Sequence, residues 1–153
     1  MTDRSAIEGI LAANRYCVIG STDASGAPWV TPVFYAPLDA DRICWVSSPD
    51  ARHSRNIASR AAVAITVFDS TVAVGSAEAA YFDAEASPVA ADQVAAALQA
   101  LNRRLPEQKQ LEPADLEPEG PLVTYQAVVR HRYVLVRGGD PVHGNTLDMS
   151  LEV

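Results

Sequence analysis

The chain has little of what would place it in a membrane or outside the cell. Its 153 residues contain no apolar run near the roughly 20 residues of a membrane-spanning helix. Acidic and basic residues near the start, with no long apolar stretch behind them, argue against a signal peptide. Cys17 and Cys44 are the only cysteines, form no CxxC pair and lie in apolar, strand-like runs. We therefore expect two buried, reduced thiols in a cytoplasmic protein with no membrane partner.

Positive charge and several functional signatures are also scarce. The 12 Lys and Arg residues stand against 19 Asp and Glu residues, and the net charge of -7 argues against nucleic acid as a partner. No G-x-G-x-x-G sequence follows the first strand-like run, which argues against a doubly wound dinucleotide fold. No serine lies in an elbow sequence near a His and an Asp, so a hydrolase triad is unsupported. His143 with Asp140 and Asp148 matches no recognised ligand spacing, so we expect a solvated tail and no metal site.

What the chain does contain is an ordinary globular composition, 48% hydrophobic and 20% charged, arranged in short β-rich runs. The expected strands are residues 16–22, 29–36, 42–48, 61–68, 72–85 and 122–137. Turn signals lie at 23–26 and 37–41, and a bend or bulge is expected near Gly75. Six strands joined by tight turns predict a closed or nearly closed antiparallel barrel, because closure removes exposed strand edges.

Helical spacing of apolar residues predicts three helices, at residues 4–14, 50–60 and 90–105. The segment 106–121 after the last of them holds four prolines and too little apolar area to form core. We consider two roles for it, a solvated connector or a lid that screens anionic substrates. The carboxylates of such a lid would be Glu107, Glu112, Asp115, Glu117 and Glu119.

The strongest functional signal lies where the strand 42–48 passes into the helix 50–60. The strand ends in the hydroxyls of Ser47 and Ser48, and the helix opens with the side-chain donors of Arg52 and His53. The free N–H groups and the positive dipole end of a helix N-terminus attract anions. Ser48 is expected to cap this helix, with Pro49 at its first position. In an acidic chain, this local group of donors predicts a pocket for a phosphate.

The order of elements around this pocket resembles that of the pyridoxamine 5′-phosphate oxidase-like group of FMN-binding split barrels. The resemblance rests on the stretch WVSSPDARHSRNI, followed by the apolar run AAVAITVFD, and covers roughly residues 4–137. It implies a mainly β, six-stranded antiparallel split barrel formed by one domain over residues 1–153. It also implies FMN as cofactor and a homodimer with the site at the subunit interface.

The resemblance further implies which residues would contact FMN. In that family the second strand lines the isoalloxazine ring with its backbone. The matching residues of this chain are Thr31, Pro32, Val33, Phe34 and Tyr35. The phosphate would be held by Ser47, Ser48, Arg52 and His53, with Ser54 and Asn56 close by. Phe34 and Trp45 are candidates for packing near the ring, the alternative for each being ordinary core.

Three features of the chain depart from the family pattern. His53 stands where many members have Lys, and His is mostly neutral at pH 7 unless a phosphate raises its pKa. Glu78 stands where a Gln often lies near the flavin. The segment Asp148-Met149-Ser150 lacks the Arg that the family tail usually keeps.

The resemblance implies an FMN-dependent oxidoreductase that acts on a small-molecule substrate. The flavin performs the redox chemistry, so no side chain needs to act as general acid or base and none is named as catalytic. Two alternatives remain: a reductase of the same fold that uses a deazaflavin cofactor, and a non-enzymatic ligand-binding protein with a degenerate flavin pocket. Retained phosphate affinity despite His53 and Glu78 favours the enzymes, whereas an acidic cleft without ligand favours the binding protein.

Overall fold

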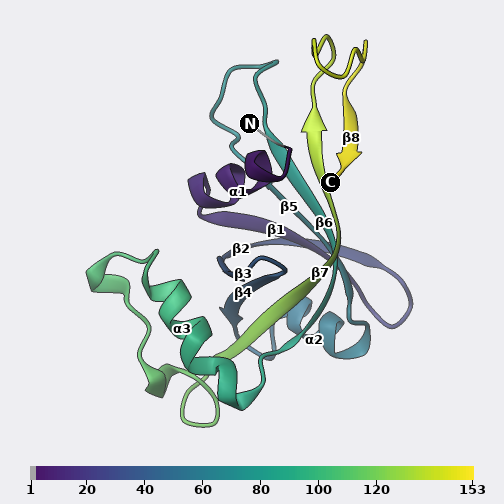
Figure 1. Cartoon of the computed structure of the whole chain (residues 1–153). Coiled ribbons are helices and arrows are strands. Elements are labelled where there is room, and N and C mark those ends of the chain that lie inside the picture. The colour runs from purple at the N-terminus through teal and green to yellow at the C-terminus, as the bar shows by residue number, and fades with distance from the viewer. Residues whose placement is uncertain (1–2) are drawn as a thin grey trace.

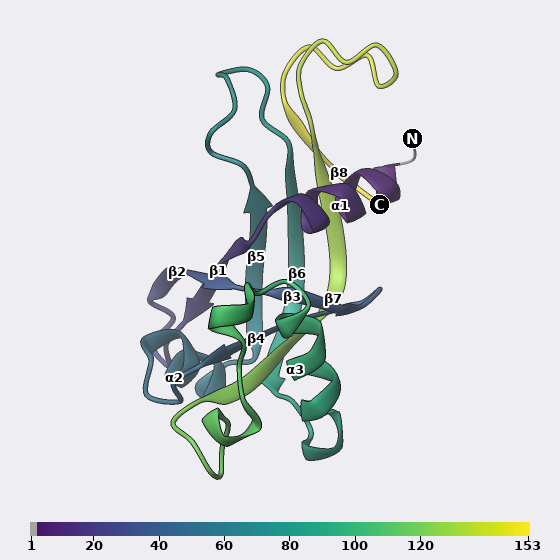
Figure 2. The same cartoon turned by 90° about the vertical axis from the view of Figure 1, so that its left-hand side faces the viewer.

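In the computed structural model, which describes residues 3–153, one antiparallel sheet curls into a half-open barrel (Figures 1 and 2). Its strands follow the order β2-β1-β5-β6-β7-β4-β3, and β8 pairs with β7. Their bounds are β1 Tyr16–Thr22, β2 Pro28–Phe34, β3 Ala36–Asp39, β4 Arg42–Ser47, β5 Ala62–Phe68, β6 Ala79–Pro88, β7 Val123–Val136 and β8 Met149–Glu152. The mainly β split barrel expected from the sequence is confirmed, with eight strands rather than six.

The two additional strands are short and lie in segments whose sequence favours turns. β3 overlaps the expected turn at 37–41 and pairs with β4, with a shift of register between Pro37 and Asp39. Pro37 is tolerated there because β3 is an edge strand, which has no second neighbour to accept an N–H. β8 lies in the expected tail and pairs with the C-terminal residues of β7, from Tyr133↔Glu152 to Val136↔Met149.

β6 begins later than the sequence suggested, at Ala79 instead of residue 72. Residues 72–76 are exposed, and Gly75 has a φ of 88°, so this part forms a turn between β5 and β6. The irregularity expected near Gly75 lies instead between Asp83 and Ala84, where the register against β7 shifts. The sheet therefore departs from regular pairing in the middle of β6, not at its start.

Three helices cover different parts of the sheet (Figure 2). α1 (Asp3–Ala13) contacts β5, β6 and β7, α2 (Arg52–Ser59) contacts β1 and β2, and α3 (Val94–Asn102) contacts β3 and β4. α1 matches its expected bounds within one residue. α3 is shorter than the expected 90–105, because a separate helical turn at Ala91–Gln93 precedes it and the chain leaves the helix after Asn102.

α2 starts later than expected, and Ser48 does not cap it. Its N-cap is Ala51, which is extended and makes no side-chain hydrogen bond to the helix. Ser48 shapes the preceding turn instead, because its Oγ accepts from the Asp50 N–H at 3.2 Å and its carbonyl accepts from the Ala51 N–H at 3.2 Å. The first turn of α2 therefore keeps its N–H groups free of a side-chain cap.

Two hydrophobic clusters hold the fold together. The larger lies between the sheet and α1 and includes Tyr35 and Trp45, whereas the smaller joins α3 to β3 and β4 through Cys44 and Leu101. Cys17 and Cys44 are both buried and free, as the sequence predicted. Between residues 3 and 153, no helix has both the length and the apolar character needed to cross a membrane.

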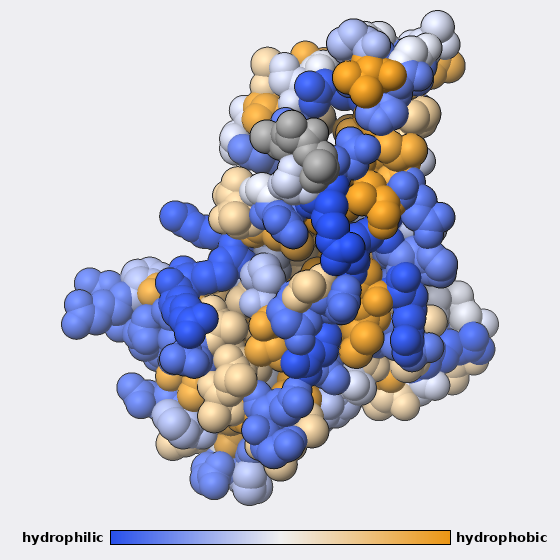
Figure 3. Space-filling model, viewed as in Figure 1, coloured by the Kyte–Doolittle hydropathy of each residue, from blue (hydrophilic) through white to orange (hydrophobic). Residues whose placement is uncertain are grey.

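The segment between α3 and β7 is irregular, as expected, but it does reach the core. Leu116 is only 3% exposed, and Leu111 packs against the smaller cluster. Short helical turns lie at Glu107–Lys109 and Pro113–Asp115. Figure 3 shows hydrophilic side chains over the protruding part of this segment beside α3. The two leucines thus fix the segment to the body while most of its carboxylates face outward.

Candidate functional site

The predicted phosphate pocket lies where β4 ends and α2 begins. Side chains alternate along β4, so Ser47 shares the barrel-facing side with Trp45. The first turn of α2 carries His53 to the same place, where its Nε2 lies 2.8 Å from Ser47 Oγ. Ser48 and Arg52 are exposed next to this pair. The structure therefore brings a hydroxyl and an imidazole into contact at this strand-to-helix junction, and the neighbouring Arg52 is exposed at the start of the helix.

His53 is enclosed by the protein. Only 8% of the surface of His53 is exposed, and this burial lowers the pKa of the imidazole below its ordinary value. Near pH 7 the ring is then neutral, with one donor and one acceptor nitrogen. Since the Ser47 hydroxyl can donate or accept, the contact between the two is compatible with either tautomer.

Arg52 lies between α2 and the edge strand β2. Its guanidinium carbon is 4.2 Å from the centre of the Trp29 ring, which is a cation–π contact. Trp29 is 39% exposed, so this contact is open to solvent beside the pocket. The sequence suggested Arg52 as a phosphate ligand but gave no sign that Trp29 would hold it, because the two residues meet only when α2 packs on β2.

The inner side of α2 holds the helix against the sheet. Asn56 Nδ2 donates to Ser21 Oγ on β1 at 3.0 Å, and both residues are buried. Ser54 is 2% exposed, and its Oγ has no hydrogen-bond partner among residues 3–153. The structure therefore buries Ser54 and Asn56 on the inner side of α2, away from the exposed Ser48 and Arg52, and gives Asn56 a partner within the protein.

β2, which the resemblance places beside the flavin ring, has a free edge. Among the described strands it pairs with β1 alone, so the backbone groups on its other side have no strand partner. Along this edge Thr31 is half-buried and Pro32 is exposed, whereas Val33 is 8% exposed and belongs to the core. Phe34 packs edge-on against Tyr16, with ring centres 6.3 Å apart. The edge strip next to the pocket thus runs from Thr31 to Phe34.

Besides Val33, two more residues of the expected flavin set lie inside the core. Tyr35 is fully buried, its N–H donates to the Arg15 carbonyl at 3.3 Å and its hydroxyl donates to the Leu11 carbonyl at 2.7 Å. Trp45 is also fully buried and stacks on Tyr125, with ring centres 6.0 Å apart. For Trp45 the structure therefore favours the core interpretation, and the Tyr35 N–H is already used by the protein.

Glu78 lies far from this pocket within one chain. It lines a separate cavity of about 560 Å³ between α1 and the loop that joins β7 to β8. That loop and the β5–β6 loop project from the end of the sheet opposite to α2 (Figures 1 and 2). Within one chain Glu78 therefore lies away from the pocket at the start of α2, and its position near a flavin ring stays a prediction.

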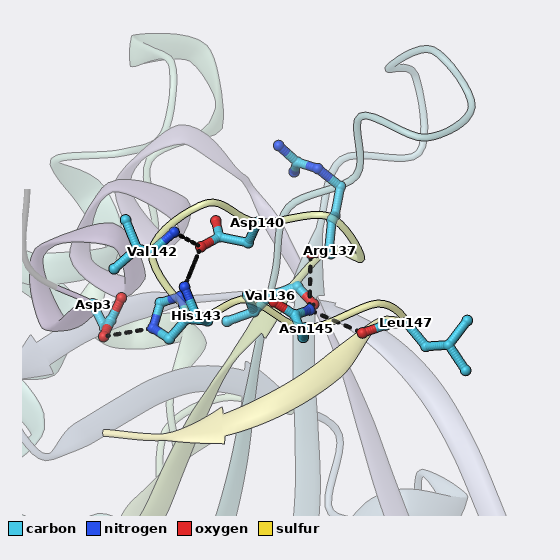
Figure 4. A network of polar contacts seen from close by, with 8 residues as sticks. All are labelled: Asp3, Val136, Arg137, Asp140, Val142, His143, Asn145 and Leu147. Atoms are coloured by element: carbon cyan, nitrogen blue, oxygen red, sulfur yellow. Dashed lines mark hydrogen bonds and ion pairs between the residues drawn. The ribbon is translucent and has the colours of Figure 1, made fainter.

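The histidine of the expected tail lies in the same cavity. Figure 4 shows His143 between two carboxylates, with Nδ1 2.9 Å from Asp140 Oδ1 and Nε2 3.8 Å from Asp3 Oδ2. Asp148 is not part of this group, because its Oδ1 accepts from the Gly138 N–H at 2.8 Å. The contacts fasten the β7–β8 loop to the start of α1.

Arg104 is a residue near the site that sequence reasoning missed. From just beyond α3 it donates to the backbone carbonyls of Leu11, Asn14 and Tyr35. Its guanidinium also lies 4.6 Å from the centre of the Tyr35 ring. These acceptors are 69 to 93 residues away along the chain, so no local pattern could have revealed the contact.

The curled sheet and its free edge strand define a protein of the split-barrel type. The sequence model of the family described as Pyridoxamine 5′-phosphate oxidase matches residues 4–130. The chain therefore belongs to the pyridoxamine 5′-phosphate oxidase family. Curated protein sequences contain no match to it.

Solved structures share the fold at low sequence identity. A heme binding protein from Mycobacterium smegmatis superposes with a TM-score of 0.74 and 16% identity, over 98% of this chain and 57% of that one. HutZ, a heme storage protein from Vibrio cholerae, gives 0.67 and 21%, over 85% and 92%. A FAD-binding protein from Mesorhizobium loti gives 0.64 and 16%, over 86% and 92%. The chain spans little more than half of the Mycobacterium protein, and these similarities establish the fold alone.

Proposed function

We propose that the chain binds FMN and uses it in an oxidoreductase reaction on a small molecule. The observation that carries the proposal is the 2.8 Å contact of His53 Nε2 with Ser47 Oγ, beside Arg52 and the uncapped first turn of α2. These donors suit a phosphate, because a hydrogen bond to a charged group contributes about 1.5–3 kcal/mol. Membership of the pyridoxamine 5′-phosphate oxidase family supports the same class of ligand.

In this proposal two parts of the chain divide the work of binding. Ser47, Ser48 and the side chains of Arg52 and His53 hold the phosphate. The free edge of β2, from Thr31 to Phe34, offers backbone groups to the polar edge of the ring. Bound FMN supplies the redox chemistry, and the chain supplies binding and orientation. No side chain is assigned a proton-transfer step.

We further propose a homodimer in which a second subunit completes the flavin groove. In a single chain the edge of β2 is open and Trp29 and Val30 are exposed, with 66% of the surface of Val30 accessible to solvent. Burial of such apolar surface favours association, and a two-fold dimer is the commonest closed arrangement. A cytoplasmic location belongs to the same proposal, since Cys17 and Cys44 are free thiols.

Two alternatives keep the fold and change the role. A reductase could use a deazaflavin cofactor, or a non-enzymatic protein could bind or store a ligand, as the names of the heme-binding neighbours suggest for those proteins. One observation supports the binding alternative. Arg52 rests on Trp29 and burial keeps His53 neutral, which leaves the pocket with few positive donors.

The direct test is to remove Arg52 and measure flavin affinity. Arg52→Ala should weaken FMN binding by about 1.5–3 kcal/mol, roughly 10- to 150-fold, because one charge-assisted bond is lost. Quenching of flavin fluorescence on titration of the ligand-free chain measures the dissociation constant. Arg60→Ala is the matched control, since Arg60 lies at the opposite end of α2 and bonds the Ala24 carbonyl at 2.9 Å. An unchanged constant for Arg52→Ala would remove Arg52 from the site, and no FMN binding by the unsubstituted chain would refute the proposal.

A further inference from the structure

We propose that the pocket is proton-linked: a ligand phosphate binds together with a proton that the His53 imidazole takes up. The inference rests on the proposed phosphate-binding function and adds to it a regulation by pH. The pocket would hold a phosphate-bearing ligand more tightly at neutral than at alkaline pH. A related ligand without the phosphate would show no such dependence.

The geometry makes His53 the group whose charge can change on binding. It is the second residue of α2, is 8% exposed, and contacts the hydroxyl of Ser47 at 2.8 Å. That hydroxyl can donate to a neutral Nε2 or accept from a protonated one, so the contact survives in both states. Arg52, whose charge is permanent, is directed onto the Trp29 ring at 4.2 Å.

The elements packed on α2 bring little charge to His53. β1 and β2 carry no Asp, Glu, Lys or Arg at all. β6 carries Asp83 and Glu85, and Glu85 is paired with Arg130 at 2.7 Å. Other charged groups around α2 are Arg52 and Arg55 on the helix, Asp50 in the turn before it, Arg60 directly after it, and Asp23 in the turn between β1 and β2, which interacts electrostatically with Arg52. The lowered pKa of His53 is caused by its burial.

Phosphate binding and protonation of His53 must then favour each other. Burial disfavours the imidazolium and keeps the pKa of His53 low in the ligand-free chain. A phosphate dianion at hydrogen-bond distance favours the imidazolium and raises that pKa. Linkage is reciprocal, so each unit of that rise corresponds to about a tenfold difference in phosphate affinity between the protonated and neutral forms.

The test compares FMN with riboflavin, which has the same ring and no phosphate. Between about pH 7 and pH 8.5 the ligand phosphate stays dianionic, because its second pKa is near 6. Over this range the dissociation constant for FMN should rise at least about threefold, whereas that for riboflavin should stay constant. Calorimetry near pH 7.5 in two buffers of different ionisation enthalpy should also record net uptake of a fraction of a proton per FMN bound.

Two variants assign the proton to His53. His53→Gln keeps a hydrogen-bonding side chain beside Ser47, so it should bind FMN more weakly near pH 7, with no pH dependence and no proton uptake. His53→Lys stays charged across the range, because the ordinary lysine pKa is about 10.4, and should also lose the dependence. His131→Gln is the matched control, since His131 is exposed on β7, and it should keep the original profile.

The outcomes separate this inference from the proposed function. FMN binding that does not vary with pH, or a pH dependence that persists in His53→Gln, overturns the inference and leaves the FMN proposal intact. Failure of FMN to bind at any pH overturns both.

Discussion

At the scale of single residues, α2 carries two buried polar side chains that differ in their hydrogen bonding. Asn56 donates to Ser21 Oγ at 3.0 Å, whereas Ser54 Oγ has no hydrogen-bond partner within residues 3–153. Asn56→Ala should lower the free energy of unfolding by about 1–3 kcal/mol, because the buried Ser21 hydroxyl loses its partner. Ser54→Ala should change it by less than about 1 kcal/mol, since no bond is lost. Urea denaturation measures both, and equal losses would contradict the assignment.

His53 carries a prediction about stability in the absence of ligand. Its pKa is lowered in the folded chain and returns to about 6.5 in the unfolded chain. Below about pH 6.5 the unfolded chain therefore binds more protons than the folded one. The free energy of unfolding decreases as the pH is lowered. The melting temperature should drop more between pH 7.5 and pH 5.5 in the unsubstituted chain than in His53→Gln. Equal drops would show that another group is responsible.

The residues of the pocket differ in how far the sequence predicts them. Ser47 and His53 lie close together along the chain, at the end of a strand and the start of a helix, so a local pattern is enough. The contact of Arg52 with Trp29 depends on how α2 packs against β2, which no local pattern encodes. Alternation placed Trp45 on one face of its strand, but only the curling of the whole sheet decides that this face is fully buried.

At the scale of elements, periodicity predicted the long, regular pieces and missed the short ones. β1 and α1 match their expected bounds almost to the residue, because each buries one regular face. β3 and β8 have four residues each, too few for a pattern to emerge. Their pairing partners β4 and β7 impose the extended conformation, so these strands are a product of tertiary structure.

The segment 106–121 has contacts that favour the connector role over the lid. Leu116 is buried, and Leu111 packs on the cluster beneath α3. Replacement of the exposed Glu107, Glu117 and Glu119 by Gln should therefore leave FMN affinity, and turnover of a surrogate quinone or dye, unchanged. A lid that screens anions would instead give faster turnover of an anionic dye and a weaker dependence on salt. An unchanged melting temperature controls for the fold.

At the scale of the whole molecule, the proposal requires a second copy of the chain. Light scattering at micromolar concentration should give twice the chain mass of 16.3 kDa. A dimer that is stable at this concentration is expected to bury more than about 2,000 Å² in its interface. Val30→Glu should shift the protein toward monomer and weaken FMN binding with it, because a charge would be buried beside the edge of β2. Val74→Glu, in the exposed β5–β6 loop, is the control. A stable monomer that still binds FMN would contradict the shared groove.

The proposed function requires that the junction of β4 and α2 holds a flavin phosphate. The most direct measurement is the ratio of the dissociation constants of riboflavin and FMN near pH 7, with heme titrated in parallel. We predict that FMN binds more tightly than riboflavin by at least about tenfold, the effect of a single charge-assisted bond, and that Arg52→Ala removes most of this difference. Equal binding of the two flavins, or binding of heme with no binding of FMN, would rule out a flavin phosphate at this junction.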